Sequence, residues 1–172
     1  MGRPMNKVTA SIGSIVFLLI APGILAGVIP WWISQWQVEP SILDVTWLKF
    51  VGVALVALGL LVLLDSFARF ALQGIGTPAP VLPTRYLVVT GTYRHVRNPI
   101  YVAVVALILG QGLLFAREGL LLFGAVTWLA FHLFVVAYEE PTLRSTFGAE
   151  YDRYVANVPR WLPRTRPWTP PS

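Results

Sequence analysis

Four apolar runs constrain this chain more than any other feature of its sequence. They cover residues 8–29, 47–67, 100–116 and 119–138, and each is close to the ~20 residues that a helix needs to cross a bilayer. Charged residues make up only 12% of the chain, against about 25% in an average globular protein. We therefore predict an all-α integral membrane protein that forms a single domain over residues 1–172, with four transmembrane helices.

The first apolar run follows Arg3 and Lys7, as the core of a signal peptide would. It is longer than such a core, which spans roughly 7–15 residues, so we interpret it as an uncleaved helix. Pro22 is expected to kink this helix. Gly23 and Gly27 form a GxxxG pair, a pattern that seats neighbouring membrane helices and would also suit a homodimer.

Lysine and arginine residues in the connecting segments predict the orientation of the chain. With the N-terminus in the cytoplasm, all basic residues except Lys49 and Arg117 fall on the cytoplasmic side. The C-terminus, the loop 68–99 and the tail 141–172 are then cytoplasmic as well. The net charge of +5 is explained by contact with anionic lipid headgroups, so we expect the bilayer as a partner and no nucleic acid. A belt at the outer membrane interface is predicted from four tryptophans, which are Trp31, Trp32, Trp36 and Trp47.

The chain has no cysteine and only two histidines, His95 and His132. Disulfides, thiolate metal sites and cysteine nucleophiles are thereby excluded, and we predict no metal site. His132 lies inside the fourth apolar run, where an ionisable group is a functional candidate. A neutral histidine hydrogen-bonded to a neighbouring helix is an equally good interpretation. In the second run, Asp65 and Arg69 are four residues apart and are predicted to pair.

The cytoplasmic loop 68–99 is rich in glycine, proline and aromatic residues, which favours an ordered loop that carries function. Residues 74–79 match the dinucleotide-binding pattern GxGxxG/A, but they do not lie between a strand and a helix, as that fingerprint requires. At the end of the loop, Asn98 is a good N-cap and Pro99 suits the first helical position. The third helix thus starts at the cytoplasmic face, where its N-terminus favours an anion. The alternative is a plain helix start with basic interfacial anchors.

The fourth helix is predicted to end at Tyr138, directly before Glu139 and Glu140. Adjacent carboxylates at a membrane boundary are costly unless they bind something cationic. Because the third and fourth helices form an antiparallel hairpin, this pair emerges on the same face as Asn98, which suits a zwitterionic ligand. The alternative is a structural clasp in which both glutamates pair with Arg97 and Arg144.

The tail that follows contains apolar and aromatic residues at helical spacing. They are Leu143, Phe147, Tyr151, Tyr154 and Val155. We predict one amphipathic helix, which either lies on the membrane or caps the helix bundle.

Several short motifs occur together in one order between Arg85 and Pro163. They are residues 87–93 (LVVTGTY), 97–101 (RNPIY), 139–140 (EE), 147–151 (FGAEY), Tyr154, 158–159 (VP) and 162–163 (LP). This ordered set resembles the isoprenylcysteine carboxyl methyltransferase family and its relatives, the phospholipid methyltransferases. The resemblance covers about half of the chain.

The resemblance implies an enzyme that uses S-adenosyl-L-methionine. It also implies a cofactor pocket formed by the cytoplasmic loop, the start of the third helix, the end of the fourth helix and the amphipathic helix of the tail. By position, the cofactor-binding residues would be Arg85, Tyr86, Leu87, Val88, Tyr93, Asn98, Pro99, Ile100, Tyr101, Glu139 and Glu140. The turn at residues 76–78 would close one side. Glu140, Glu139 and Arg97 would be the catalytic residues. For an amine substrate, Glu140, Glu139 or His132 would accept the proton, and Arg97 or Arg85 would orient an anionic head.

Two departures from the family pattern limit what the resemblance implies. Asn98 replaces the usual histidine, so a role that needs a charged ring is lost. Val135 stands where the prenylcysteine enzymes carry an arginine that binds the substrate carboxylate. We therefore expect methyl transfer to a lipid-like or small amphipathic substrate that need not be a prenylcysteine. The alternatives are a phospholipid N-methyltransferase and a non-catalytic membrane protein that retains the fold.

Overall fold

The computed structural model describes residues 20–40, 43–73 and 87–169. Within these ranges the chain is helical and forms no strand. The chain divides into two compact units. Of the described residues, the bundle unit comprises 20–40, 43–63 and 100–132, and the tail unit comprises 64–73, 87–99 and 133–169.

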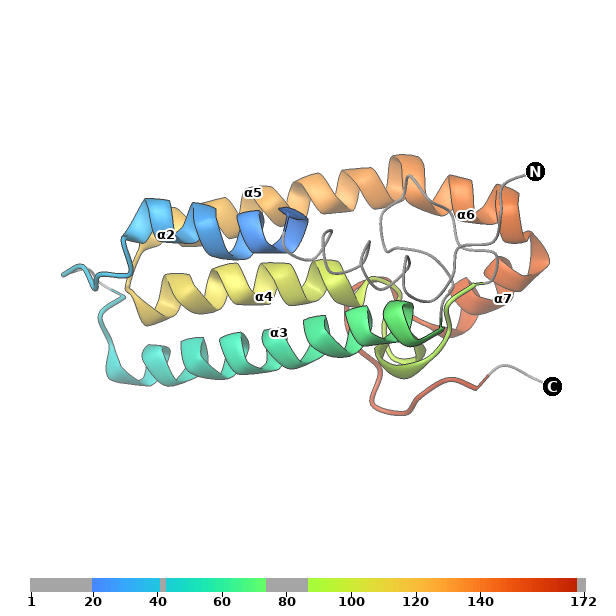
Figure 1. Cartoon of the computed structure of the whole chain (residues 1–172), viewed down its shortest axis with the longest axis horizontal. Helices are drawn as coiled ribbons and strands as arrows, with labels where there is room; N and C mark the ends of the chain where they lie inside the picture. The colour runs from blue at the N-terminus through green and yellow to red at the C-terminus, as the bar shows by residue number, and fades with distance from the viewer. Residues whose placement is uncertain (1–19, 41–42, 74–86, 170–172) are drawn as a thin grey trace. The chain divides into compact units, whose positions relative to one another are not determined.

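Four helical segments build the bundle unit (Figure 1). They are the run Ile20–Ser34, α3 (Thr46–Gln73), α4 (Pro99–Leu114) and α5 (Glu118–Phe134). The first run is regular only in part, because it widens into a π turn, η1 (Ile24–Val28), before α2 (Ile29–Ser34). Pro30 lies at the start of α2. A proline has no N–H for the i→i−4 ladder, and a π turn placed before it lets the helical run continue.

Helix α4 lies between α3 and α5 (Figure 1), and small residues set its distance from both. A Cβ atom added at Gly52 of α3 would lie 2.7 Å from the carbonyl oxygen of Gly110 on α4. A Cβ atom added at Gly124 of α5 would lie 2.6 Å from the side chain of Leu109 on α4. Side chains on the buried face of α4 are almost fully covered, with Ile108 at 0% and Val104 at 1% exposure. The core of this unit therefore lies around α4.

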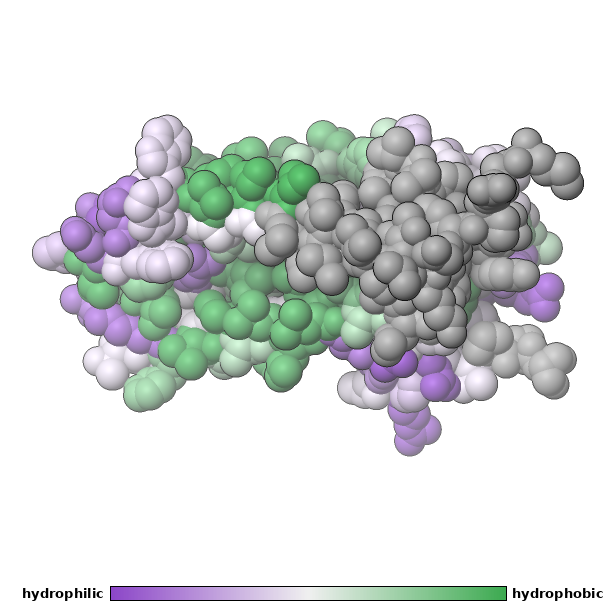
Figure 2. Space-filling model, viewed as in Figure 1, coloured by the Kyte–Doolittle hydropathy of each residue, from purple (hydrophilic) through white to green (hydrophobic). Residues whose placement is uncertain are grey.

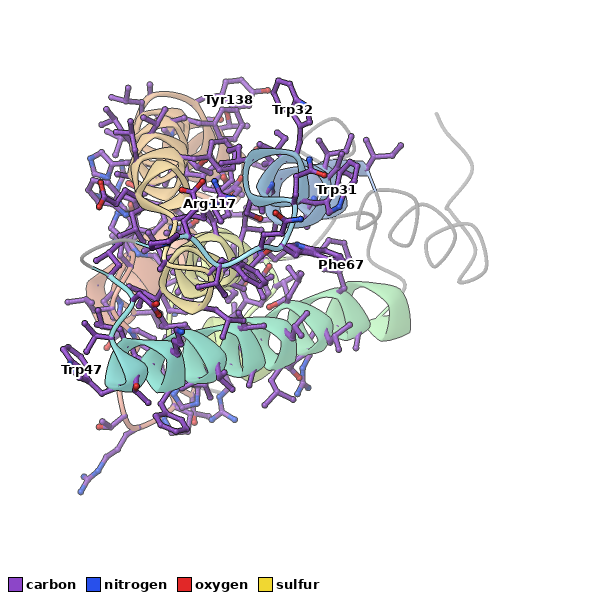
Figure 3. All side chains as sticks on the ribbon, turned by 90° about the vertical axis from the view of Figure 1, so that its left-hand side faces the viewer. Trp31, Trp32, Trp47, Phe67, Arg117 and Tyr138 are labelled. Carbon is purple, nitrogen blue, oxygen red and sulfur yellow. The ribbon has the colours of Figure 1, made fainter. Side chains whose placement is uncertain are left out.

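The end of the bundle unit where α4 joins α5 is held by Arg117. Its guanidinium donates to the carbonyl oxygens of Ser34 and Gln37 and pairs with the Glu39 carboxylate. The turn itself depends on Ala116, which has a φ of +53°. Figure 3 shows Arg117 among the helix ends, with the side chains of Trp31, Trp32 and Trp47 farther out. The predicted tryptophans are exposed, with Trp32 at 75%, as an interfacial belt requires.

The predicted runs are helical wherever the structure describes them, but the bounds of the helices differ from the prediction. Two runs, Thr46–Arg69 and Glu118–Phe147, are long and apolar enough to cross a membrane. Helix α4 has 16 residues, which is about 24 Å and shorter than the ~30 Å hydrocarbon core. The first helix is described only from Ile20, so most of the predicted run 8–29 lies outside the described residues. The structure therefore supports two candidate spans, and four crossings stay a prediction.

Apolar side chains cover the outside of the bundle unit. Phe50, Leu58 and Leu61 of α3 and Leu122 of α5 are each at least 60% exposed. Figure 2 shows apolar residues over the helical middle of this unit and polar residues at the end where α4 joins α5. A contiguous apolar surface of this kind is typical of a protein surrounded by lipid.

Of the described residues, the tail unit contains the end of α3, the segment 87–99 and residues 133–169. Its described elements are η2 (Gly91–Arg94), η3 (Val135–Glu139), α6 (Glu140–Phe147) and α7 (Ala149–Asn157), followed by an extended segment to Thr169. Its core is a cluster of Tyr151, Tyr154 and Val158, which are 1–3% exposed. Residues from the loop and the tail cover this cluster, namely Leu87, Val89, Leu143, Phe147, Val155 and Trp168.

Two predictions for this region were wrong. The fourth helix does not end at Tyr138, because it continues without interruption through the π turn η3 into α6 and ends at Phe147. Pro141 lies in the first turn of α6, and the wider π turn before it accommodates its missing N–H. The tail is also not one amphipathic helix. Gly148, with φ +51° and ψ −125°, separates α6 from α7 in a conformation that favours glycine.

Candidate functional site

Most of the described candidate residues lie in the tail unit, on the segment 87–99 and around the start of α6. Contacts between residues distant in sequence hold these two parts in place. The loop carries the motif residues Tyr93, Arg97 and Asn98.

The loop is anchored on the end of α3 by Asp65. Its carboxylate accepts hydrogen bonds from Arg69, at 2.9 and 3.1 Å, and from the backbone N–H of Thr92, at 3.2 Å. The predicted pair of Asp65 and Arg69 is therefore confirmed. The buried hydroxyl of Ser66 lies 3.1 Å from the Thr92 hydroxyl. Gly91 has a φ of +57° and no room for a side chain beside Arg69, so the turn before Tyr93 requires glycine.

The far side of the same loop is held by Tyr154 of α7. Its hydroxyl donates a hydrogen bond of 2.7 Å to the carbonyl oxygen of Tyr93, and its side chain is only 3% exposed. Burial raises the pKa of Tyr154 above its ordinary value, so the neutral hydroxyl that donates this bond is favoured. Tyr93 is thus fixed from both sides, from α3 through Thr92 and from α7 through Tyr154.

The Glu140 carboxylate joins the loop to α6 and to the C-terminal segment. Its Oε1 accepts from Arg97 Nη1 at 2.8 Å and from Arg160 Nε at 2.6 Å, and its Oε2 accepts from Arg160 Nη2 at 2.9 Å. Glu140 is 9% exposed. The clasp considered from the sequence therefore exists for Glu140, but its second arginine is Arg160. Arg144 forms its ion pair with Asp152 instead, at 2.8 Å.

The Arg97 guanidinium is almost buried, with its side chain 11% exposed. Its Nη1 binds Glu140, whereas its buried Nε has no hydrogen-bond partner among the described residues. A buried guanidinium N–H without a partner is costly. Arginine suits carboxylate and phosphate groups, but this Nε is enclosed by protein, so a ligand oxygen would reach it only after neighbouring atoms moved.

The segment 158–169 runs beside the loop in the opposite direction, and we call it the C-terminal strap. Backbone hydrogen bonds link Arg97 to Pro159 (2.9 Å), Arg164 to His95 (3.0 Å) and Trp168 to Arg94 (2.9 Å). Side chains add to these, because Asn98 Nδ2 donates to the Arg160 carbonyl at 3.2 Å and Arg94 Nε donates to the Trp168 carbonyl at 2.6 Å. The predicted N-cap residue Asn98 thus also binds the strap.

Sequence reasoning did not identify Arg160 or the strap. The matched motif included the two prolines, Pro159 and Pro163, which flank Arg160. Prolines at this spacing exclude a helix and favour extended backbone. This spacing was the sequence signal that could have indicated an ordered extended segment around Arg160. Its partners lie 20 and 62 residues away, which no local pattern indicates.

The other candidate residues are placed as follows. Arg85, Tyr86 and the turn 76–78 lie outside the described residues. Val88 is buried, and Leu87 packs on the tyrosine core. Glu139 is the last residue of η3 and is half-buried.

The remaining candidates belong to the bundle unit. Ile100 and Tyr101 are in the first turn of α4, and the Tyr101 ring lies 4.6 Å from that of Phe131. His132 stacks on Trp128 with ring centroids 5.4 Å apart.

Comparison with known proteins adds one finding. No curated protein matches the chain in a sequence search. A family model described as phospholipid methyltransferase matches residues 47–150, which is more than half of the 172 residues. The matched region contains α3 from its second residue onward, α4, α5 and the pair Glu139 and Glu140. The chain therefore belongs to the phospholipid methyltransferase family of membrane methyltransferases.

Proposed function

We propose that the protein is an S-adenosyl-L-methionine-dependent methyltransferase that acts on a lipid-like or small amphipathic substrate at the cytoplasmic face of a membrane. The observation that carries this proposal is the contact between Arg97 and Glu140, at 2.8 Å. These residues are 43 positions apart in the sequence, and each belongs to one of the two motifs that the resemblance assigns to the site. The chain folds so that the two motifs meet.

The residues of the site suit the cofactor. The methionine part of S-adenosyl-L-methionine carries a carboxylate and an ammonium group, and its sulfonium supplies a methyl group that a nucleophile can take. The unpartnered Nε of Arg97 suits an anionic oxygen once neighbouring atoms have moved. Glu139 is the proposed partner of the ammonium group on the strength of the resemblance, and Glu140 is the carboxylate that Arg97 and Arg160 hold in place. Arg85, Tyr86, Leu87, Val88, Tyr93, Asn98, Pro99, Ile100 and Tyr101 complete the proposed pocket on the strength of the resemblance.

The protein contributes position and exclusion of water, while the cofactor contributes the reactive group. Tyr93 is held rigidly by the loop contacts, which favours a fixed pocket wall. If the substrate nucleophile is a carboxylate, no base is needed. If it is an ammonium group, its proton must leave before its lone pair can bond to the methyl carbon. Glu139 is then the candidate base, because Glu140 is bound by two guanidinium groups.

The chain is proposed to cross the membrane four times with both termini in the cytoplasm. The exposed apolar residues of the bundle unit support a bilayer around it, through which a lipid substrate would reach the site. The alternative substrate class is a phospholipid amine, and membership of the family is compatible with either class. The rival proposal is a non-catalytic protein that keeps the fold.

Binding of S-adenosylhomocysteine to the full chain in detergent tests the proposal. We expect micromolar affinity in the wild type and a loss of at least about tenfold in Glu139→Gln, because a charge-assisted hydrogen bond contributes about 1.5–3 kcal/mol. Glu150→Gln is the matched control, since Glu150 is an exposed carboxylate on α7. No binding below the millimolar range would contradict the proposed function and favour the non-catalytic rival.

The substrate is tested separately by radiolabelled methyl transfer from the cofactor into a total lipid extract. A labelled phospholipid would establish the phospholipid alternative, and a labelled product of another class would exclude it. The expected requirement for Glu139 in this reaction differs between an amine and a carboxylate substrate. Only an amine makes the rate depend on a basic carboxylate, visible as a fall in kcat at low pH.

A further inference from the structure

The strongest unassigned feature of the tail unit is Arg160, which comes from the strap and reaches the acidic pair at the start of α6. It donates two hydrogen bonds to Glu140, at 2.6 and 2.9 Å, one to each carboxylate oxygen. This is the bidentate geometry in which arginine binds carboxylates most strongly. The Glu140 carboxylate raises the pKa of Arg160, so the guanidinium remains charged.

The backbone of Arg160 is fixed at the same time as its side chain. Its carbonyl oxygen accepts from Asn98 Nδ2 at 3.2 Å, and the carbonyl of Pro159 accepts from the N–H of Arg97 at 2.9 Å. Asn98 is 7% exposed, so this contact is buried. One residue of the strap thus connects the residue before α4 to the first residue of α6.

We propose that Arg160 is a positioning residue of the methyltransferase site, and that the C-terminal strap is a structural part of that site. Through Glu140, Arg160 sets the orientation of the π turn that presents Glu139. Through Asn98, it sets the start of α4. This inference rests on the proposed function, because it assigns Arg160 to the same cofactor site.

The residue type and the distribution of charge both favour this role. Glu140 without Arg160 would keep one guanidinium partner, Arg97, and one oxygen without a described donor. A buried carboxylate in that state is costly, and the start of α6 would shift to find other donors. Lysine would keep the charge but lose the two-point contact. The expected order of cofactor affinity is therefore wild type, then Arg160→Lys, then Arg160→Gln.

The test measures S-adenosylhomocysteine affinity and thermal unfolding for Arg160→Gln, Arg160→Lys, Glu140→Gln and the double variant Arg160→Gln/Glu140→Gln. Arg153→Gln is the matched control, because Arg153 is an exposed arginine on α7 and its loss changes the net charge equally. We expect Arg160→Gln to weaken binding by about tenfold or more, Arg160→Lys to restore part of it and Arg153→Gln to have no effect. If Arg160 acts through Glu140, the double variant binds about as well as the weaker single variant.

The outcomes separate the inference from the function on which it rests. A wild type without affinity for S-adenosylhomocysteine overturns both. If the wild type and Arg160→Gln bind S-adenosylhomocysteine equally well, the inference alone is overturned. This holds even if thermal unfolding shows that Arg160 and Glu140 are coupled, because their contact is then only structural. Additive losses of affinity in the double variant also overturn it, since Arg160 would then act independently of Glu140.

Discussion

Tyr154 shows how one side chain in the tail unit links folding to the geometry of the site. Its ring belongs to the buried core, and its hydroxyl holds the Tyr93 carbonyl at 2.7 Å. Replacement by phenylalanine keeps the ring and removes the hydrogen bond. We expect Tyr154→Phe to lower the free energy of unfolding by about 1 kcal/mol and to weaken S-adenosylhomocysteine binding through the displaced Tyr93. Tyr138→Phe, at an exposed tyrosine, should change neither quantity.

The raised pKa of Tyr154 also predicts a dependence of stability on pH. The unfolded side chain ionises near pH 10, whereas burial raises the folded pKa above that value. The stability contribution is therefore complete below about pH 10 and is lost as the pH rises further. Thermal unfolding between pH 8 and pH 11 should show a fall in the wild type that is smaller in Tyr154→Phe. An equal fall in both proteins would contradict this assignment. Some fall remains in the variant, because burial also raises the pKa of Tyr151.

Single residues of the site were predictable where local chemistry was distinctive. The adjacent glutamates at 139 and 140 stood out because carboxylates are costly at a membrane boundary. The partner of Glu140 could not be predicted in this way, because its pairing with Arg160 depends on how the C-terminal strap folds back. The sequence suggested Arg144 as the second arginine of the clasp, whereas tertiary structure brings Arg160 to that place.

At the scale of the helices, the apolar runs predicted the starts of α3, α4 and α5 to within one residue. The ends were less predictable. Helix α3 was predicted over about 47–67 but continues to Gln73, and its last turns contain the Asp65–Arg69 pair. The run after α5 passes Pro141 through a π turn, a solution that helix periodicity does not reveal. Conversely, the break at Gly148 interrupts a pattern that is periodic in sequence.

The close contact of α3 with α4 gives a prediction for the bundle unit. A Cβ at Gly52 would lie 2.7 Å from the Gly110 carbonyl oxygen and 2.9 Å from the Leu114 backbone nitrogen. Because backbone atoms cannot rotate away, Gly52→Ala must separate the two helices. We expect a loss of about 1–3 kcal/mol in unfolding free energy, the usual effect of overpacking. Gly27→Ala is the control, since nothing described lies within 4 Å of a Cβ there. Equal melting temperatures for both variants would show that the glycine contact does not limit the packing.

At the scale of the whole chain, the distribution of basic residues determines the predicted orientation. Lys49 and Arg117 are the basic residues assigned to the outer side, and both have acidic partners, Asp44 and Glu39. The rest lie in segments assigned to the cytoplasm. A protein whose cofactor comes from the cytoplasm needs its site residues on that side. The predicted orientation places them there, so it is consistent with the proposed function.

The absence of cysteine allows this orientation to be measured directly with single introduced thiols. Gln37→Cys probes the predicted outer loop, and Ala149→Cys probes the start of α7. Both residues are exposed, and the contact of Gln37 with Arg117 uses its backbone carbonyl, which a cysteine keeps. In intact cells, a membrane-impermeant maleimide should label Gln37→Cys and leave Ala149→Cys unlabelled, while permeabilised cells should show labelling of both. The reverse pattern would place Glu139 and Arg97 on the side away from the cytoplasmic cofactor, and the proposed methyl transfer would then have no supply of its methyl donor.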